Sequence, residues 1–179
     1  MSAILTIARR ELAEGVRNRW VVSMTAVMAA LAGAIAALGS APTGSTATGA
    51  LDVVVVGLAS LTIFLVPLIA LLLSHDSITR EAERGTLLLL LSHPLARWQV
   101  VAGKFLGQLA ILALATVIGF GCAAVFVIWR HGAEGWQAFA FMTAVSVLLG
   151  AVFLGLGVLA SSVVQELSLI HISEPTRQE

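Results

Sequence analysis

Four long apolar segments alternate with shorter polar ones along the chain. The apolar segments comprise residues 20–38, 53–73, 105–129 and 138–160, and none of them contains Asp, Glu, Lys or Arg. A helix needs about 20 apolar residues to cross the hydrocarbon core of a bilayer. One charged residue at its centre would cost about 2.5–3.5 kcal/mol on insertion scales. The pattern therefore predicts an all-α membrane protein with four transmembrane helices.

Residues 3–19, ahead of the first apolar segment, have a mixed pattern. Apolar side chains recur every three or four residues and would share one face of a helix: Leu5, Ala8, Leu12, Val16 and Trp20. Charged side chains fall mostly on the other faces, and Arg10 and Glu14 would form a weakly favourable pair one turn apart. This pattern predicts an amphipathic elbow helix in the membrane interface, with Trp20 at headgroup depth. The alternative is a basic flank of the first span with no separate role.

The basic residues predict the orientation of the spans, because cytoplasmic loops carry an excess of Lys and Arg. Most of them precede the first span or lie between the second and third: Arg9, Arg10, Arg17, Arg19, Arg80, Arg84, Arg97 and Lys104. Residues 39–52 contain no Lys or Arg, and residues 130–135 contain one. Both termini and residues 74–104 are therefore expected to face the cytoplasm.

Small residues recur on the predicted spans at spacings that bring them onto one helical face, where another helix can approach closely. Those expected to pack are Gly103, Gly107, Ala115, Gly119 and Ala123 of the third span and Gly150 and Gly157 of the fourth. Pro67 in the second span removes one helical hydrogen bond. It is expected to produce a kink, and a gating hinge at this position is the alternative.

Residues 74–104 form the longest polar segment and contain the main candidate site. The charged residues 76–84 can extend the second helix into water. Gly85 then interrupts it, and the hydroxyl of Thr86 can cap a new short helix. Residues 87–91 are all leucine but are too few to span a bilayer. We predict a surface that contacts a cytoplasmic partner, with simple solvation as the alternative; its candidate residues are Arg80, Glu81, Glu83, Gly85, Thr86, Leu87 and Leu88.

Composition excludes several other functions. The chain is 59% hydrophobic and 11% charged, whereas soluble domains are about 25% charged. No basic face for nucleic acid is present, and no G-x-x-x-x-G-K-[ST] loop that could hold ATP phosphates. Glu81 and Glu83 are two residues apart, so they point to different sides of a helix and do not form a catalytic pair. No catalytic residue is therefore expected.

Several of these residues resemble a known family. Glu81, Glu83, Gly85, Thr86, the leucine run, Pro94, Arg97 and Gly103-Lys104 look like the signature of ABC-2-type transporter permeases. The likeness covers residues 1 to about 166. Within the family, residues 7–20, 64–73 and 118–124 resemble the membrane subunit of the transporter that matures nitrous oxide reductase.

The resemblance implies a non-catalytic permease subunit in the bacterial inner membrane. It further implies a coupling helix after the second span that docks on a cytoplasmic ATPase, so that ATP binds to the partner and this chain needs no cofactor. A second permease copy, a periplasmic accessory protein and membrane lipids would be the other partners. The process would be maturation of a copper enzyme. A generic exporter of unknown cargo and a membrane anchor or assembly subunit without transport are the alternatives.

The copper connection draws attention to Met24 and Met28, which share a face of the first span. Thioether sulfur suits Cu(I), but two methionines at helical spacing more often serve packing. His75, His93 and His131 form no ligand cluster. No metal site is therefore expected, with the two methionines as a weak alternative.

The family pattern also raises an expectation about the end of the chain. Such permeases have six spans, and this sequence has four, so we expect a truncated permease domain over residues 1–166. Residues 167–179 resemble a translated sequencing adapter and are expected to be an artefactual tail. His171 and Glu174 therefore receive no functional interpretation.

Overall fold

The computed structural model describes residues 3–39, 50–84, 97–131 and 136–172, with side chains for residues 3–39, 53–75, 98–129 and 136–160. These residues form the helices α1 (Ala3–Val16), α2 (Arg19–Gly39), α3 (Ala50–Arg84), α5 (Arg97–His131) and α6 (Trp136–Ile172). Four of them are long and apolar enough to cross a membrane, over Arg19–Gly39, Val53–His75, Trp98–Trp129 and Trp136–Ala160. The all-α fold with four candidate spans is thereby confirmed.

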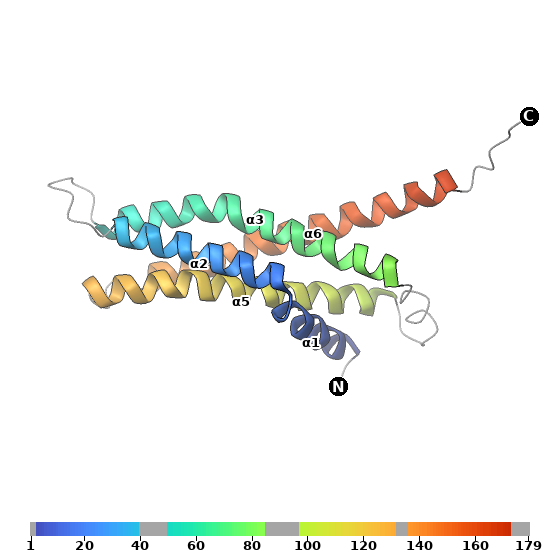
Figure 1. Cartoon of the computed structure of the whole chain (residues 1–179), viewed down its shortest axis with the longest axis horizontal. Coiled ribbons are helices and arrows are strands. Elements are labelled where there is room, and N and C mark those ends of the chain that lie inside the picture. Colours follow the sequence, from blue (N-terminus) through green and yellow to red (C-terminus); the bar gives the residue numbers. More distant parts are fainter. Residues whose placement is uncertain (1–2, 40–49, 85–96, 132–135, 173–179) are drawn as a thin grey trace, which may run out of the picture.

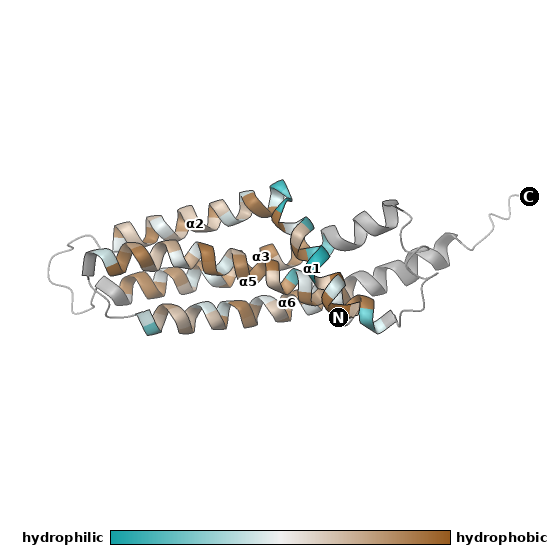
Figure 2. Ribbon diagram, turned by 90° about the horizontal axis from the view of Figure 1, so that it is seen from below, coloured by the Kyte–Doolittle hydropathy of each residue, from teal (hydrophilic) through white to brown (hydrophobic). Residues whose placement is uncertain are grey.

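The four long helices run side by side, and α1 lies at an angle at one end of the bundle, where α2 begins and α3 ends (Figure 1). Helix α5 contacts α1, α2, α3 and α6. Helices α2 and α6 lie on opposite sides of α3 and α5 (Figure 2), and their described residues do not contact each other. In the most apolar stretch of α5, 44% of the residues are buried, against 17% in α2 and α6. Helix α5 is therefore the centre of the bundle.

The core contains side chains from all four long helices. The largest fully buried apolar side chains are Met28 of α2, Leu58 of α3, Leu112 and Phe120 of α5 and Leu154 of α6. Many apolar side chains on the outer faces stay exposed, for example Phe64 and Leu148. This distribution is expected of helices whose outer surface meets lipid rather than water. Polar residues gather at α1 and at its junction with α2 (Figure 2).

The elbow helix ends earlier than the predicted range 3–19. Helix α1 ends at Val16 and α2 begins at Arg19. Between them, the side-chain oxygen of Asn18 accepts a hydrogen bond from the backbone N–H of Trp20 at 3.0 Å. Asn is a favoured residue at the start of a helix because its side chain satisfies a free N–H there. Trp20 therefore belongs to α2 and not to the apolar face of α1.

The third candidate span begins at Trp98 rather than at residue 105. At a rise of 1.5 Å per residue, Trp98–Trp129 is about 46 Å long. That length exceeds the hydrocarbon core of about 30 Å and matches a whole bilayer with its headgroups. The first turns of α5 can therefore lie at headgroup depth, where a charged residue such as Lys104 is tolerated inside a continuous helix. All four tryptophans of the chain lie near span ends and are exposed, as in an interfacial aromatic belt.

Candidate functional site

The segment that the sequence predicts to contact a partner begins in the last turns of α3 and continues in the residues that precede α5. Arg80, Glu81 and Glu83 are on the last turns of α3, which ends at Arg84. Gly85, Thr86, Leu87 and Leu88, and with them the predicted short coupling helix, lie outside the described residues. Beside this segment, polar and close backbone contacts hold α3, α5 and α1 together.

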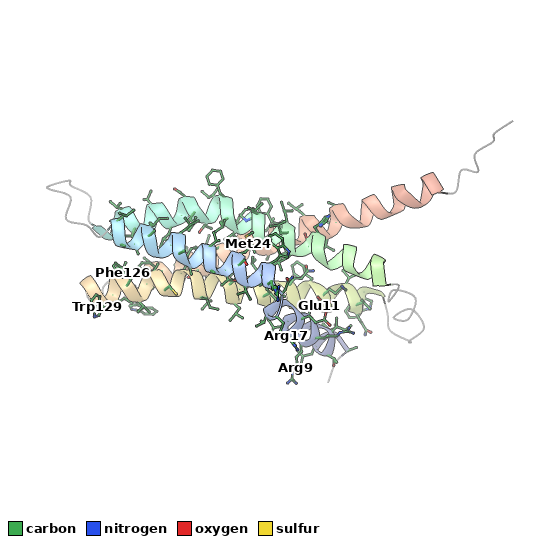
Figure 3. The ribbon with its side chains drawn as sticks, viewed as in Figure 1. Arg9, Glu11, Arg17, Met24, Phe126 and Trp129 are labelled. Atoms are coloured by element: carbon green, nitrogen blue, oxygen red, sulfur yellow. The ribbon has the colours of Figure 1, made fainter. Side chains whose placement is uncertain are left out.

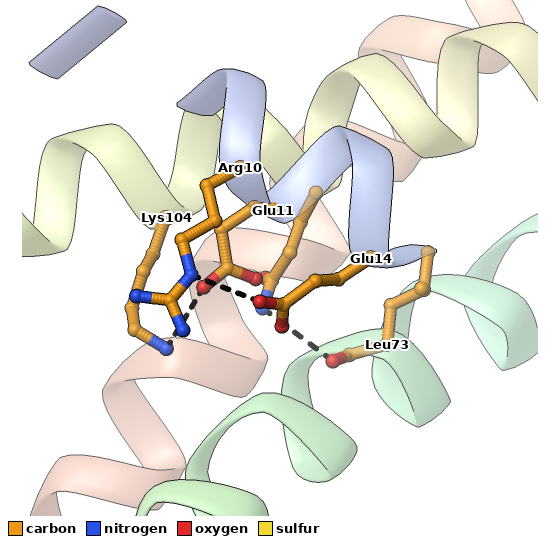
Figure 4. A network of polar contacts seen from close by, with 6 residues as sticks. Arg10, Glu11, Glu14, Leu73 and Lys104 are labelled. Atoms are coloured by element: carbon orange, nitrogen blue, oxygen red, sulfur yellow. Dashed lines mark hydrogen bonds and ion pairs between the residues drawn. The ribbon is translucent and has the colours of Figure 1, made fainter. Parts of the chain in front are cut away.

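Gln108 joins the two helices on either side of this segment. Its side chain is 3% exposed, and its Nε2 donates a hydrogen bond to the backbone carbonyl of Leu73 in α3 at 3.5 Å (Figure 4). This distance is longer than the usual 2.7–3.2 Å, so the bond is weak. Its buried Oε1 has no hydrogen-bond partner among the described residues. A buried polar group without a partner costs about 1–3 kcal/mol of stability. Because the bond to Leu73 is also long, Gln108 joins α3 and α5 only weakly.

An ion pair joins α1 to α5 one turn away. The Nζ of Lys104 lies 3.3 Å from Oε1 of Glu11, and the two side chains are only 15% and 23% exposed. A second pair, between Arg10 and Glu14 of α1, has an N···O distance of 2.9 Å but exposures of 72% and 48% (Figure 4). Exposed pairs typically contribute about 0–1 kcal/mol because water screens them. The Glu11–Lys104 pair is better shielded and is therefore the stronger connection.

Glycines bring the backbones of α1 and α5 into close approach. A Cβ at Gly103 would lie 2.8 Å from Cβ of Ile7 and 3.0 Å from the carbonyl oxygen of Ile4. A Cβ at Gly107 would lie 3.0 Å from the carbonyl oxygen of Ala8. Backbone atoms and Cβ atoms cannot rotate away as the end of a long side chain can, so any larger residue would push α1 off α5.

The same contacts define the register of α1 on α5. Ile7 lies at Gly103, Ala8 at Gly107, and the buried Gly15 faces the side chain of Ile111. Residue numbers increase together on both helices, so α1 runs parallel to the first turns of α5. The exposed Leu5 and Val16 lie off this contact, at 55% and 46% exposure. The face of α1 that meets α5 thus overlaps the predicted apolar face only in part: Ala8 lies in the contact, whereas Leu5 and Val16 stay exposed.

The other small residues lie along helix contacts in the bundle. Ala115 and Ala123 are 4% and 0% exposed, and a Cβ at Gly119 would lie 2.9 Å from Cγ of Met28 in α2. On α6, a Cβ at Gly150 would meet the side chains of Leu112 and Val66. A Cβ at Gly157 would meet the hydroxyl of Ser74 and lie 2.8 Å from its Cβ. In lipid, such shape-dependent contacts are a main source of helix association.

Replacing Gly157 with alanine should separate α6 from α3. The new methyl group would collide with the short side chain of Ser74, which has no long arm to move, and overpacking of this kind costs about 1–3 kcal/mol. Gly155→Ala is the matched control, because no other helix among the described residues lies within 4 Å of a Cβ there. Thermal unfolding in lipid nanodiscs should show a lower midpoint for Gly157→Ala than for Gly155→Ala. Equal midpoints for the two variants would contradict the predicted contact.

Two buried hydroxyls meet between α3 and α6. Oγ1 of Thr62 lies 3.2 Å from Oγ of Ser146. Thr62 also bonds the carbonyl of Leu58 at 3.0 Å, and Ser146 bonds the carbonyl of Met142 at 2.7 Å. Each hydroxyl has one hydrogen to donate, so only two of these three contacts can be hydrogen bonds at once. The pair holds the middle of the bundle together without a charge.

The structure gives the positions of Pro67, Met24 and Met28 and their neighbours. Helix α3 continues through Pro67, which is half-buried. Met28 is buried against Gly119, and Met24 lines an open cavity between α2 and α3. Among the described residues, no group of three or more His, Cys, Asp or Glu side chains could hold a metal ion. Met28 thus packs against α5, and Met24 faces the cavity.

The sequence-based prediction did not include Glu11, Gln108, Thr62 or Ser146. The last three could have been found, because they are polar residues inside the apolar segments 105–129, 53–73 and 138–160. Polar residues at such positions commonly bond across helices. Glu11 offers no such signal, since its partner Lys104 is far away in the sequence and only the fold brings the two together.

Comparison with known proteins places the chain in a family. Residues 5–169 match the model of the ABC-2 family transporter protein. The "Probable ABC transporter permease protein NosY" of Stutzerimonas stutzeri is 46% identical over 173 residues, which cover 94% of this chain and 62% of the relative. The protein of the same name from Pseudomonas aeruginosa is 46% identical over 172 residues, with the same coverage. The chain thus spans less than two thirds of the length of these relatives.

The family match and the bundle agree with each other. The matched residues include most of α1 and all four candidate spans. Four apolar helices of this length identify an integral membrane protein. The chain belongs to the ABC-2 family of transporter proteins.

Proposed function

We propose that this chain is part of the membrane-embedded, non-catalytic permease subunit of an ATP-driven transporter. Its α1 end would face the cytoplasm of a bacterial cell, in the inner membrane, and a separate ATPase would bind and hydrolyse ATP. Family membership and 46% identity to two proteins named as permeases support this proposal. The excess of Lys and Arg before the first span and between the second and third supports the orientation.

The segment around Arg80–Leu88 is the proposed contact with the ATPase. It lies between α3 and α5, so a push on it would act on both helices at once. Gln108 links α5 to α3 at Leu73, and Lys104 links α5 to α1 at Glu11. Movement of the segment would act on α3 and α5 through the chain itself, and the Glu11–Lys104 pair and the glycine contacts would carry it to α1. These connections favour a subunit that transmits force from the ATPase over one that only anchors other proteins in the membrane.

The proposed process is maturation of nitrous oxide reductase in the periplasm. The proposal rests on the likeness of residues 7–20, 64–73 and 118–124 and on the identity to the two NosY proteins over 94% of the chain. A second copy of the permease and a periplasmic accessory protein would complete the assembly. The broad exposed apolar faces of α2 and α6 leave room for further membrane partners. A generic exporter of other cargo is the second candidate, since family membership alone does not specify the cargo.

A chimera tests this proposal. Residues 1–166 of this chain would replace the matching part of the S. stutzeri NosY protein, in a strain that lacks its own copy. The chimera should restore most of the nitrous oxide reduction, and Glu83→Lys or Gly85→Pro in the same chimera should abolish it and release the ATPase on co-purification. Charge reversal on the proposed cytoplasmic contact would replace attraction by repulsion, and proline would disturb the break after α3.

The matched control is Glu134→Lys, the same charge reversal in the sequence between α5 and α6. It should leave both nitrous oxide reduction and ATPase association intact. A stable chimera that retains the ATPase but gives no nitrous oxide reduction would favour other cargo. Undiminished ATPase association in both loop variants would reject the proposed contact.

A further inference from the structure

An open cavity of about 200 Å³ lies between the start of α2 and the last membrane turns of α3. Its walls are mainly apolar and include Met24 of α2 and Leu72 of α3. Asn18 and His75 are its polar lining residues. In Figure 3, Arg17 lies at the turn between α1 and α2, and Met24 lies further along α2 beside α3. The cavity thus has an apolar body and a polar rim at the α1 end.

Water is a poor occupant for this cavity. A single water molecule needs only about 10–15 Å³ measured in this way but also two to four polar partners, and most of the lining offers none. An empty cavity would forfeit dispersion contacts along its walls. Both α2 and α3 are candidate membrane spans, so lipid can reach the opening. Several methylene groups of an acyl chain would fill the space.

Two basic residues are the sequence neighbours of Asn18, which lines the rim. Arg17 and Arg19 flank Asn18, and both side chains are exposed. The nearest acidic residue before them, Glu14, is paired with Arg10. Arginine binds phosphate with parallel hydrogen bonds, and basic pockets between membrane helices bind anionic headgroups. A lipid with a negative headgroup complements this rim better than a neutral one.

We propose that the cavity binds one anionic phospholipid, with one acyl chain against Met24 and Leu72 and the phosphate held by Arg17 and Arg19. The bound lipid would tie the turn between α1 and α2 to the end of the α3 span. It would thereby stabilise the end of the bundle from which residues 76–96 emerge.

Native mass spectrometry and thermal unfolding of the full chain from nanodiscs test this site. The discs contain phosphatidylcholine alone or mixed with phosphatidylglycerol. Phosphatidylglycerol should be retained preferentially and should raise the unfolding midpoint. Because each basic residue near an anionic surface contributes about 1 kcal/mol, Arg19→Gln should weaken retention by roughly fivefold. The control Arg9→Gln removes an exposed charge from α1 away from the cavity and should change retention little.

Filling the cavity provides a second, independent measurement. Leu72 lines the cavity but is 46% exposed, so Leu72→Trp can be accommodated and should abolish the phosphatidylglycerol-dependent stabilisation while helicity is kept. In a variant that retains Trp20 as its single tryptophan, phosphatidylglycerol with brominated acyl chains should quench the fluorescence more than brominated phosphatidylcholine. Equal retention of both lipids, or equal effects of Arg19→Gln and Arg9→Gln, would overturn the proposal. Unchanged stabilisation in Leu72→Trp would show that the lipid, or another occupant, binds elsewhere.

Discussion

Leucine in place of Gly107 should detach α1 from α5. The added side chain would run into the backbone of α1, whose Ala8 carbonyl oxygen would lie 3.0 Å from the new Cβ. Overpacking costs about 1–3 kcal/mol, and here the simplest relief is for the whole of α1 to move away. Hydrogen–deuterium exchange reports local opening of this kind. Amide exchange of residues 3–16 should therefore rise by roughly tenfold or more, since about 1.4 kcal/mol corresponds to a factor of ten.

Gly121→Leu is the control for this experiment. It lies on the same helix, but no other helix in the described part of the chain comes within 4 Å of a Cβ at that position. Both variants gain the preference of leucine over glycine for the helix, about 0.8–1 kcal/mol, so the difference between them isolates the contact with α1. Unchanged exchange of residues 3–16 in Gly107→Leu would show that α1 is not held by this contact.

Charge reversal at Glu11 or Lys104 should have the second largest effect. In Glu11→Lys, two ammonium groups would face each other at a site where the native side chains are 23% and 15% exposed. Breaking a fully buried pair costs about 3–5 kcal/mol and an exposed pair about 0–1 kcal/mol. This partly buried pair should therefore cost about 1–3 kcal/mol. Thermal unfolding in nanodiscs and exchange of residues 3–16 would measure the loss.

The double variant Glu11→Lys with Lys104→Glu tests whether the ion pair itself is responsible. It should recover at least half of the lost stability, because attraction is restored with the charges exchanged. Glu14→Lys reverses the charge of an exposed pair on the same helix and should cost at most about 0.5 kcal/mol. If the double variant is as unstable as the sum of the two single variants, the pair does not couple the helices.

Both predictions concern the same mechanical connection. Helix α1 packs on the first turns of α5, directly after the proposed ATPase contact. Loss of α1 should therefore weaken the response of the bundle to that contact even where the contact residues are intact. The chimera described above would report this as reduced nitrous oxide reduction with retained ATPase association.

Much of the fold was predictable from hydrophobicity. The four spans follow from segments without a charge, and each segment has this property independently of its neighbours. The elbow helix was also predictable, but its end was not, because Asn18 caps α2 and separates Trp20 from α1. The start of the third span at Trp98 was not predicted, because the charge of Lys104 indicates that an apolar segment begins after it. In the fold, Glu11 pairs with Lys104, so the helix can begin earlier.

The sequence predicted which residues form the candidate site, and the structure showed how the neighbouring helices α1, α3 and α5 contact one another. Arg80, Glu81 and Glu83 fall on the end of α3, and their proposed contact with an ATPase stays a prediction. Gly103 and Gly107 were predicted to pack without a known partner, and the partner is α1. Glu11 and Gln108 were not singled out, because nothing local to either residue indicates a contact on another helix.

The sequence by itself determined that this chain has four segments apolar and long enough to cross a membrane, which polar segments carry most of the basic residues, and where the polar segment between the second and third of these candidate spans lies. Partition of a segment into a bilayer depends on the composition of that segment, so each candidate span can be recognised from its own residues. Only the tertiary structure decided which face of α1 meets α5, that α5 is central, and that α2 and α3 enclose a cavity. Lipid is as apolar as leucine, so helix association in a bilayer depends on shape and on paired polar groups. Those depend on residues far apart in the chain.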